Sequence, residues 1–160
     1  MLHSRFYLIV LKLLQETLST LDLVSGDKVE FLLIIAPVEE SYNLAQAAFR
    51  VGKEYKLSTK VCVLWPAGIG TGLHPGSKAK LAPWKNYIDV MEVKRSSDSL
   101  SWWRTCQITE QGAILVRPDE HIAWRSKSSV VGDPYSEMKM VFSTILGIES
   151  ANIRNHVFNI

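Results

Sequence analysis

A strand–helix–strand pattern in the first half of the sequence restricts the possible folds more than any other feature. The apolar run from Lys28 to Pro37, with Val-Glu-Phe-Leu-Leu-Ile-Ile-Ala at its centre, predicts a buried strand that ends at a proline. A second apolar run, Thr59 to Trp65, predicts another strand. Between them, Glu39 to Lys56 is predicted to be a helix, because apolar residues recur at helical spacing: Leu44, Ala47, Ala48, Val51 and Tyr55. This order predicts a βαβ unit, in which two parallel strands share one sheet.

The segments on either side of this unit supply further elements. Arg5 to Leu14 is apolar at nearly every position, which predicts a strand buried on both faces. Asn86 to Lys94 predicts another strand. Ser96 or Ser97 is expected to cap a short helix that ends at Gln107, since serine is a favoured N-cap residue.

A closing helix is predicted from Pro134 to Leu146. Asp133 before it is a good N-cap, proline suits the first helical position, and Gly147 suits the position after the last turn. The glycine- and proline-rich segment from Ala67 to Trp84 is predicted to be a loop. Residues 148–160 have no clear periodicity and are expected to form a tail.

A β-hairpin is predicted from two short strand-like runs, Ala113 to Val116 and His121 to Arg125. The residues between them include Pro118, Asp119 and Glu120. Because glutamate has a Cβ, which disfavours positive φ, a two-residue type I′ turn is not expected here. The sequence predicts a longer loop that includes the proline.

The hairpin sequence also resembles a segment of a known family. Gly112 to Arg125, Gly-Ala-Ile-Leu-Val-Arg-Pro-Asp-Glu-His-Ile-Ala-Trp-Arg, is similar to the last hairpin in the C-terminal domain of FAD-dependent aromatic hydroxylases, the phenol-hydroxylase-like flavin monooxygenases. Ser19-Thr-Leu-Asp-Leu-Val-Ser-Gly26 is similar to a segment that precedes the central strand of that domain. The family typically has Asp-Gly at the hairpin turn, where this chain has Asp119-Glu120. The resemblance extends over residues 4 to 147, which is most of the chain.

The resemblance implies an α/β fold, namely a thioredoxin-like sandwich with a central mixed sheet and extra N-terminal strands. It implies a single domain over residues 1–160. In the family this domain follows a flavin domain, which holds FAD. The resemblance therefore implies that this chain binds no cofactor of its own and hydroxylates nothing by itself.

Composition narrows the range of partners. The chain has 160 residues and a formal net charge of +2, and it has no run of Lys or Arg, which argues against nucleic acid or an anionic membrane as a partner. The apolar run from Phe6 to Leu14 is too short to span a membrane, is interrupted by Lys12 and lacks a convincing signal cleavage site. A cytoplasmic protein is expected.

Thiol chemistry is not expected from this sequence. Thioredoxin-type exchange requires a thiol of low pKa where the helix after the central strand begins, and Pro37 to Ser41 contains no cysteine. Cys62 and Cys106 form no CxxC motif, and no Cys/His cluster has the spacing of a zinc site. One disulfide between them is possible, but two buried free thiols are favoured in a cytosolic protein.

A few residues are candidates for a site. The segment Gly68-Ile-Gly-Thr-Gly72 lacks the third glycine and the following helix of a dinucleotide-binding motif, so it is interpreted as a flexible loop. His74 in the predicted loop and His121 on the hairpin are candidate catalytic acids or bases, with solvated surface histidines as the alternative. Four aromatic residues are candidates for binding an aromatic substrate, with core packing or a dimer interface as the alternative: Tyr87, Trp102, Trp103 and Trp124.

Three functional hypotheses remain open. The first is a stand-alone, redox-inactive thioredoxin-like domain that acts in subunit association, or as a partner of a flavin monooxygenase in aromatic or polyketide secondary metabolism. The second is a small cofactor-independent isomerase or cyclase that binds an aromatic or polyketide intermediate and uses a histidine as acid or base. The third is a fragment of a full-length FAD-dependent hydroxylase. A homodimer with an apolar, tryptophan-containing interface is expected, because aromatic residues are enriched at interface centres.

Overall fold

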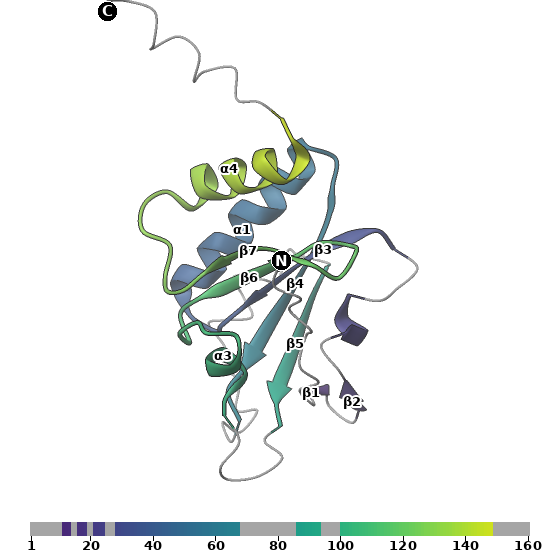
Figure 1. Ribbon diagram of the computed structural model, residues 1–160, viewed down its shortest axis with the longest axis vertical. Helices are drawn as coiled ribbons and strands as arrows, with labels where there is room; N and C mark the ends of the chain where they lie inside the picture. Colours follow the sequence, from purple (N-terminus) through teal and green to yellow (C-terminus); the bar gives the residue numbers. More distant parts are fainter. Residues whose placement is uncertain are drawn as a thin grey trace, which may run out of the picture.

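The computed structural model of the protein describes residues 11–13, 16–18, 21–24, 28–67, 86–93 and 100–148. These residues form a twisted sheet with helices on its faces (Figure 1). Nearly all of the predicted loop from Ala67 to Trp84, with His74, lies outside the described residues. The same holds for most of the first predicted strand and of the C-terminal tail. Among the described residues, no helix combines the length and the apolar character needed to cross a membrane.

The sheet has seven strands in the order β2-β1-β5-β4-β3-β6-β7. β3, β4 and β5 run parallel, and the other neighbouring pairs are antiparallel, so the predicted mixed sheet is confirmed. The strands are β1 (Leu11–Leu13), β2 (Glu16–Leu18), β3 (Glu30–Ile35), β4 (Ser58–Trp65), β5 (Tyr87–Glu92), β6 (Ala113–Val116) and β7 (Ile122–Ser126). β1 and β2 are the predicted extra N-terminal strands, although a residue range was predicted only for the first of them.

The central βαβ unit forms as predicted. β3 is buried along its whole length, and α1 (Glu39–Glu54) connects it to β4. Leu33 pairs with Val61 in the middle of the parallel ladder. α1 begins without a side-chain cap, because its N-cap residue, Val38, is apolar.

The second half of the fold is a hairpin followed by a helix. In the hairpin, the backbone N–H of Arg117 donates to the carbonyl of His121 at 2.8 Å, and the N–H of Glu120 donates to the carbonyl of Arg117 at 3.0 Å. The loop therefore has three residues and includes Pro118, so the predicted longer loop is confirmed. Glu120 nevertheless adopts a left-handed conformation, with φ 66°.

The closing helix, α4 (Pro134–Leu146), has the predicted bounds and caps. The Asp133 carboxylate accepts a hydrogen bond from the backbone N–H of Ser136 at 2.9 Å, and Gly147 ends the helix with φ 65°. The short helix α3 (Trp102–Thr105) differs from its prediction. Ser101 caps it and it has four residues, while Ser96 and Ser97 lie outside the described residues.

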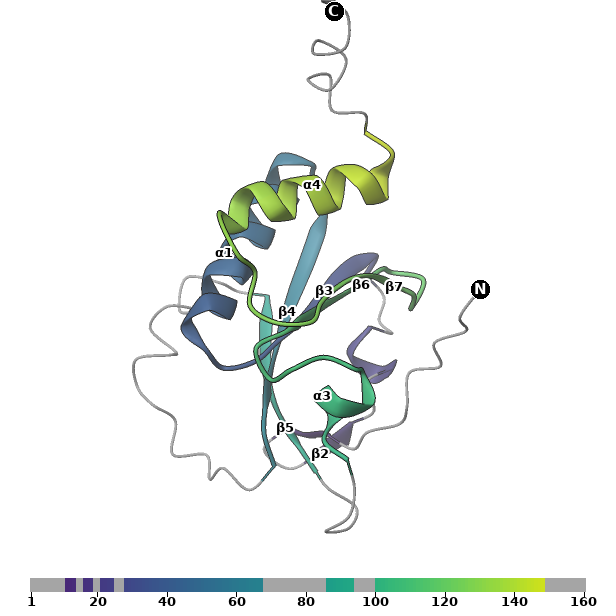
Figure 2. The ribbon, with the colours of Figure 1, turned by 60° about the vertical axis from the view of Figure 1, so that its left-hand side comes forward.

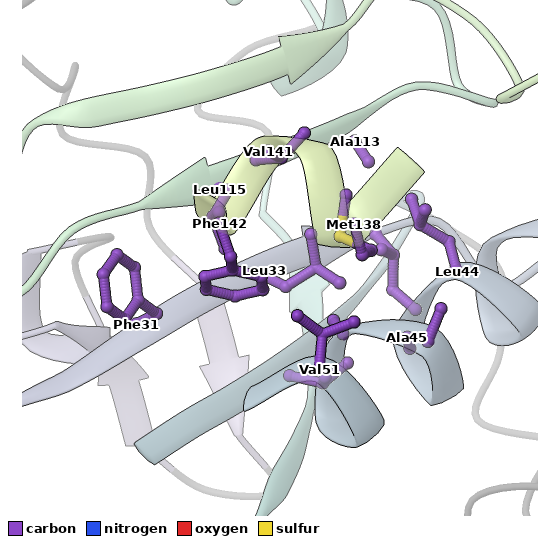
Figure 3. Packing of buried hydrophobic residues seen from close by; sticks show 14 of the residues in the cluster. Phe31, Leu33, Leu44, Ala45, Val51, Ala113, Leu115, Met138, Val141 and Phe142 are labelled. Atoms are coloured by element: carbon purple, nitrogen blue, oxygen red, sulfur yellow. The ribbon is translucent and has the colours of Figure 1, made fainter. Parts of the chain in front are cut away.

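Hydrophobic residues pack on both faces of the sheet. Successive residues of β3 point to opposite faces, so Leu33 joins a cluster with α1 and α4, and Leu32 joins a cluster with α3. Figure 3 shows the first cluster, in which the rings of Phe31 and Phe142 meet edge to face, 5.3 Å between centroids. Turning the molecule shows α4 crossing α1 on one side of the sheet and α3 on the other (Figure 2). The predicted α/β sandwich is confirmed.

Candidate functional site

The start of α1 is the place where a thioredoxin-like fold could support thiol chemistry. Val38 is the N-cap and Ser41 lies three residues later, which is the spacing of a CxxC motif, and neither residue is a cysteine. Ser41 is 4% exposed. A hollow of about 10 Å³ lies here, lined by Glu40, Ser41, Leu44, Gln111, Ala113, Ser128, Ser129 and Val130. This volume is about the space that one water molecule needs.

Both cysteines are free thiols and lie away from the start of α1. Cys62 is fully buried on β4, and this burial raises the pKa of its thiol far above its usual range. Cys106 follows α3 and is half-buried; burial raises the pKa of this thiol to about 11, although the charge of Arg125 opposes the shift. Since the thiolate is the reactive form, both environments suppress thiol reactivity near neutral pH.

His121 lies on the hairpin turn with its side chain 79% exposed. Its Nδ1 atom is 2.7 Å from the carbonyl oxygen of Asp119 and 3.6 Å from that residue's carboxylate. The same carboxylate accepts a hydrogen bond from Arg117 at 2.6 Å. His121 thus contacts Asp119 on an exposed turn. The other candidate, His74, lies outside the described residues.

The four candidate aromatic residues do not line one site. Trp102 and Trp103 are each 1% exposed and pack edge to face, 4.9 Å between centroids, in the cluster beneath α3. Tyr87 and Trp124 are half-buried and pack against the cluster on the opposite face of the sheet. The sheet therefore separates the two pairs, and the first pair contributes to the hydrophobic core.

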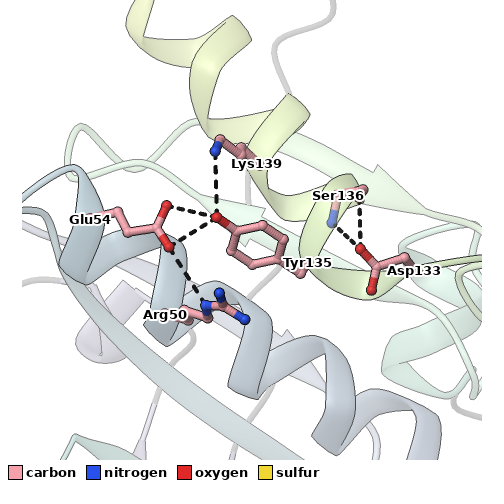
Figure 4. A network of polar contacts seen from close by, with 6 residues as sticks. All are labelled: Arg50, Glu54, Asp133, Tyr135, Ser136 and Lys139. Carbon is pink, nitrogen blue, oxygen red and sulfur yellow. Dashed lines mark hydrogen bonds and ion pairs between the residues drawn. The ribbon is translucent and has the colours of Figure 1, made fainter.

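A polar network that was not predicted from the sequence joins α1 to α4 (Figure 4). The Tyr135 hydroxyl donates to the Glu54 carboxylate at 2.8 Å, and Lys139 Nζ donates to the same hydroxyl at 3.4 Å. The Arg50 guanidinium lies 4.2 Å from the centre of the Tyr135 ring and 3.6 Å from the Glu54 carboxylate. The network holds one helix against the other. Within each helix the i, i+4 spacing is a local signal, for Arg50 with Glu54 and for Tyr135 with Lys139, but no local pattern indicates the contact between the helices.

Comparison with known proteins identifies relatives of this chain. The aromatic-ring hydroxylase, C-terminal family matches residues 58–148, more than half of the chain. Phenol 2-monooxygenase from Pseudomonas sp. is 48% identical over 42 residues, which are 26% of this chain and 7% of that protein. A putative polyketide hydroxylase from Streptomyces coelicolor is 36% identical over 55 residues, 34% of this chain and 9% of that protein. The matched segments thus span less than a tenth of these relatives.

Solved structures share the fold. Aklavinone-11 hydroxylase, solved with FAD and aklavinone, superposes with a TM-score of 0.58 at 22% identity, covering 89% of this chain and 21% of that chain. A thioredoxin-like protein from Aeropyrum pernix superposes with a TM-score of 0.52 at 13% identity, covering 81% of this chain and 84% of that one. The fold is therefore thioredoxin-like, and the chain belongs to the aromatic-ring hydroxylase C-terminal family, as the hairpin sequence predicted.

Proposed function

We propose that this chain is a redox-inactive thioredoxin-like domain that acts in subunit association, or as an accessory to a flavin monooxygenase of aromatic or polyketide metabolism. The proposal rests on the identity of the residues at the start of α1. The two positions of a CxxC motif hold Val38 and Ser41, while both cysteines lie elsewhere with raised thiol pKa values. This role applies to the domain whether it acts as a separate chain or within a longer one.

The described residues at the start of α1 do not fit a flavin. A flavin needs a cleft of several hundred Å³, the usual size of ligand pockets, whereas the hollow beside Ser41 has a volume of about 10 Å³. We therefore assign no flavin site to the start of α1. A visible absorption spectrum of the purified protein tests this assignment. A colourless protein is expected, and the visible absorption band of a bound flavin, which makes a protein yellow, would contradict it.

The exposed apolar side chains support association more than catalysis. Trp102 and Trp103 are enclosed in the core, so they are not available to a partner. Large apolar side chains that are exposed remain on the described surface: Val29, Val93, Leu100, Val131, Met140, Leu146 and Ile148. Exposed apolar groups of this kind contribute to protein interfaces when they lie close together.

Light scattering of the full chain tests the association. The proposal predicts a mass above that of the monomer at high micromolar concentration, alone or after addition of a flavin monooxygenase from the same source. A strict monomer that binds no such enzyme would refute the proposal. An insulin-reduction assay tests the proposed redox inactivity. The expected rate of insulin reduction equals that of the buffer alone.

A further inference from the structure

The outer side of α1 carries a polar stripe whose charges are separated along the helix. Residues 39, 43, 46, 50 and 53 follow the spacing i, i+4, i+7, i+11 and i+14, which places them on one face. All five of these residues are polar and exposed: Glu39, Asn43, Gln46, Arg50 and Lys53. The acidic residue is at one end of this α1 stripe, the two basic residues are at the other, and neutral amides lie between them.

The basic end of the α1 stripe is available to a second molecule. Lys53 has an exposed side chain. It is 14 residues from Glu39, about 21 Å along the helix, and this exceeds the screening length of about 8 Å at physiological salt. The two charges therefore cannot stabilise each other within one molecule.

Arg50 is already ordered in the single chain. Its guanidinium lies over the Tyr135 ring and beside Glu54, while its side chain remains 69% exposed. An ordered side chain loses less conformational entropy when it binds a partner than a free one does. The intrachain network thus presents one basic group of the α1 stripe in a fixed position.

We propose that the α1 stripe is a self-association surface, on which α1 of a second copy packs antiparallel about a two-fold axis. This places Glu39 opposite the partner's Lys53, and Asn43 close to the partner's Arg50. Gln46 lies at the axis and faces its own copy, amide to amide. A parallel arrangement would place like charges opposite each other, so the charge pattern selects the antiparallel one.

This inference rests on the association role proposed above and names the surface and the partner, a second copy of this chain. Acidic residues at the start and basic residues at the end also stabilise a helix in isolation. The test must therefore separate an effect on association from an effect on the helix. Charge reversal with rescue in the same chain does this, because a two-fold interface pairs each residue with its complement on the other copy.

The experiment is sedimentation equilibrium of the full chain at low salt, with far-UV circular dichroism to confirm that each variant is folded. Lys53→Glu is expected to raise the dimer Kd about tenfold or more, since both copies lose a pair and gain a repulsion. The double variant Glu39→Lys/Lys53→Glu is expected to restore Kd to within about threefold of the original protein. Lys127→Glu, which makes the same charge change at an exposed position after β7, should leave Kd within about twofold.

Substitution of Gln46 tests the two-fold axis directly. Gln46→Glu and Gln46→Lys should each weaken self-association, because either charge meets its own copy at the axis. An equimolar mixture of the two variants should form a heterodimer tighter than either homodimer. If the Lys53→Glu and Gln46 variants dimerise with the same Kd as the original protein, this surface is refuted and the proposed association role remains intact. A monomer at every concentration would refute both the surface and self-association.

Discussion

At Glu120 the hairpin turn holds a side chain in the left-handed region of the backbone, with φ 66°. A residue with a Cβ is disfavoured there by about 1–2 kcal/mol, whereas glycine is not. Glycine also makes the unfolded chain more flexible, at a cost of about 0.5–1 kcal/mol. The conformation is required because a three-residue hairpin loop needs its last residue in this region.

Glu120→Gly is therefore expected to raise the free energy of unfolding by roughly 0.5–1 kcal/mol, measured by urea titration. Glu110→Gly is the matched control, since Glu110 is an exposed turn residue that is not at positive φ. The control should give no increase. An equal effect from both substitutions would show that the turn conformation is not the cause.

Cys106 allows a test of its local environment through pH. Burial raises the pKa of this thiol to about 11 from an ordinary value near 9, so at any pH below about 11 the folded protein holds less thiolate than the unfolded chain. At pH 8 iodoacetamide should therefore alkylate Cys106 more slowly in the folded protein than in urea. The rate in the folded protein should keep rising up to about pH 11. A folded-state rate that levels off at pH 9 would contradict the assigned environment.

Long periodic elements were predictable because their signal is local. The apolar spacing of α1 and α4, the continuous run of β3 and the two halves of the hairpin each specify an element within its own residues. The second N-terminal strand, β2, could not be located in the sequence because Glu16–Leu18 is too short to show a period. α3 was misplaced because its start depends on a distant partner: the Glu92 carboxylate accepts a hydrogen bond from the Trp102 backbone N–H at 2.5 Å.

The packing of α4 against the sheet gives a prediction at the element scale. Phe142 is fully buried and meets Phe31 edge to face, while Met140 on the same helix is 57% exposed. Phe142→Ala should lower the free energy of unfolding by about 3–5 kcal/mol, through lost burial and the cavity that remains. Met140→Ala, measured in the same urea titrations, should change it by no more than about 0.5 kcal/mol. Similar losses from both would contradict the assigned faces of α4.

The candidate site was less predictable than the fold because its parts come from distant segments. Tyr135 and Glu54 are 81 residues apart, and no local pattern indicates that they meet. The aromatic candidates illustrate the same difficulty, since only the sheet topology shows that Trp102 and Trp124 lie on opposite faces. The absence of a thiol at the start of α1 was predictable, because it depends only on which residues follow the central strand.

For the molecule as a whole, the central proposal is that this thioredoxin-like fold is redox-inactive because the start of α1 carries no cysteine. Val38 and Ser41 occupy the N-cap and the third position of α1, where a helix N-terminus lowers the pKa of a thiol. Introducing cysteines at both positions should therefore produce a redox-active disulfide on an otherwise unchanged fold. The original protein serves as the matched control for this substitution.

The most direct test is insulin reduction in the presence of dithiothreitol, comparing the original protein with the variant Val38→Cys/Ser41→Cys. The account predicts a rate equal to that of the buffer for the original protein and a clearly faster rate for the variant. Insulin reduction by the original protein above the buffer rate would contradict the claim of redox inactivity. A folded variant that forms no disulfide between the two new cysteines would contradict the placement of these positions in a thioredoxin-like scaffold.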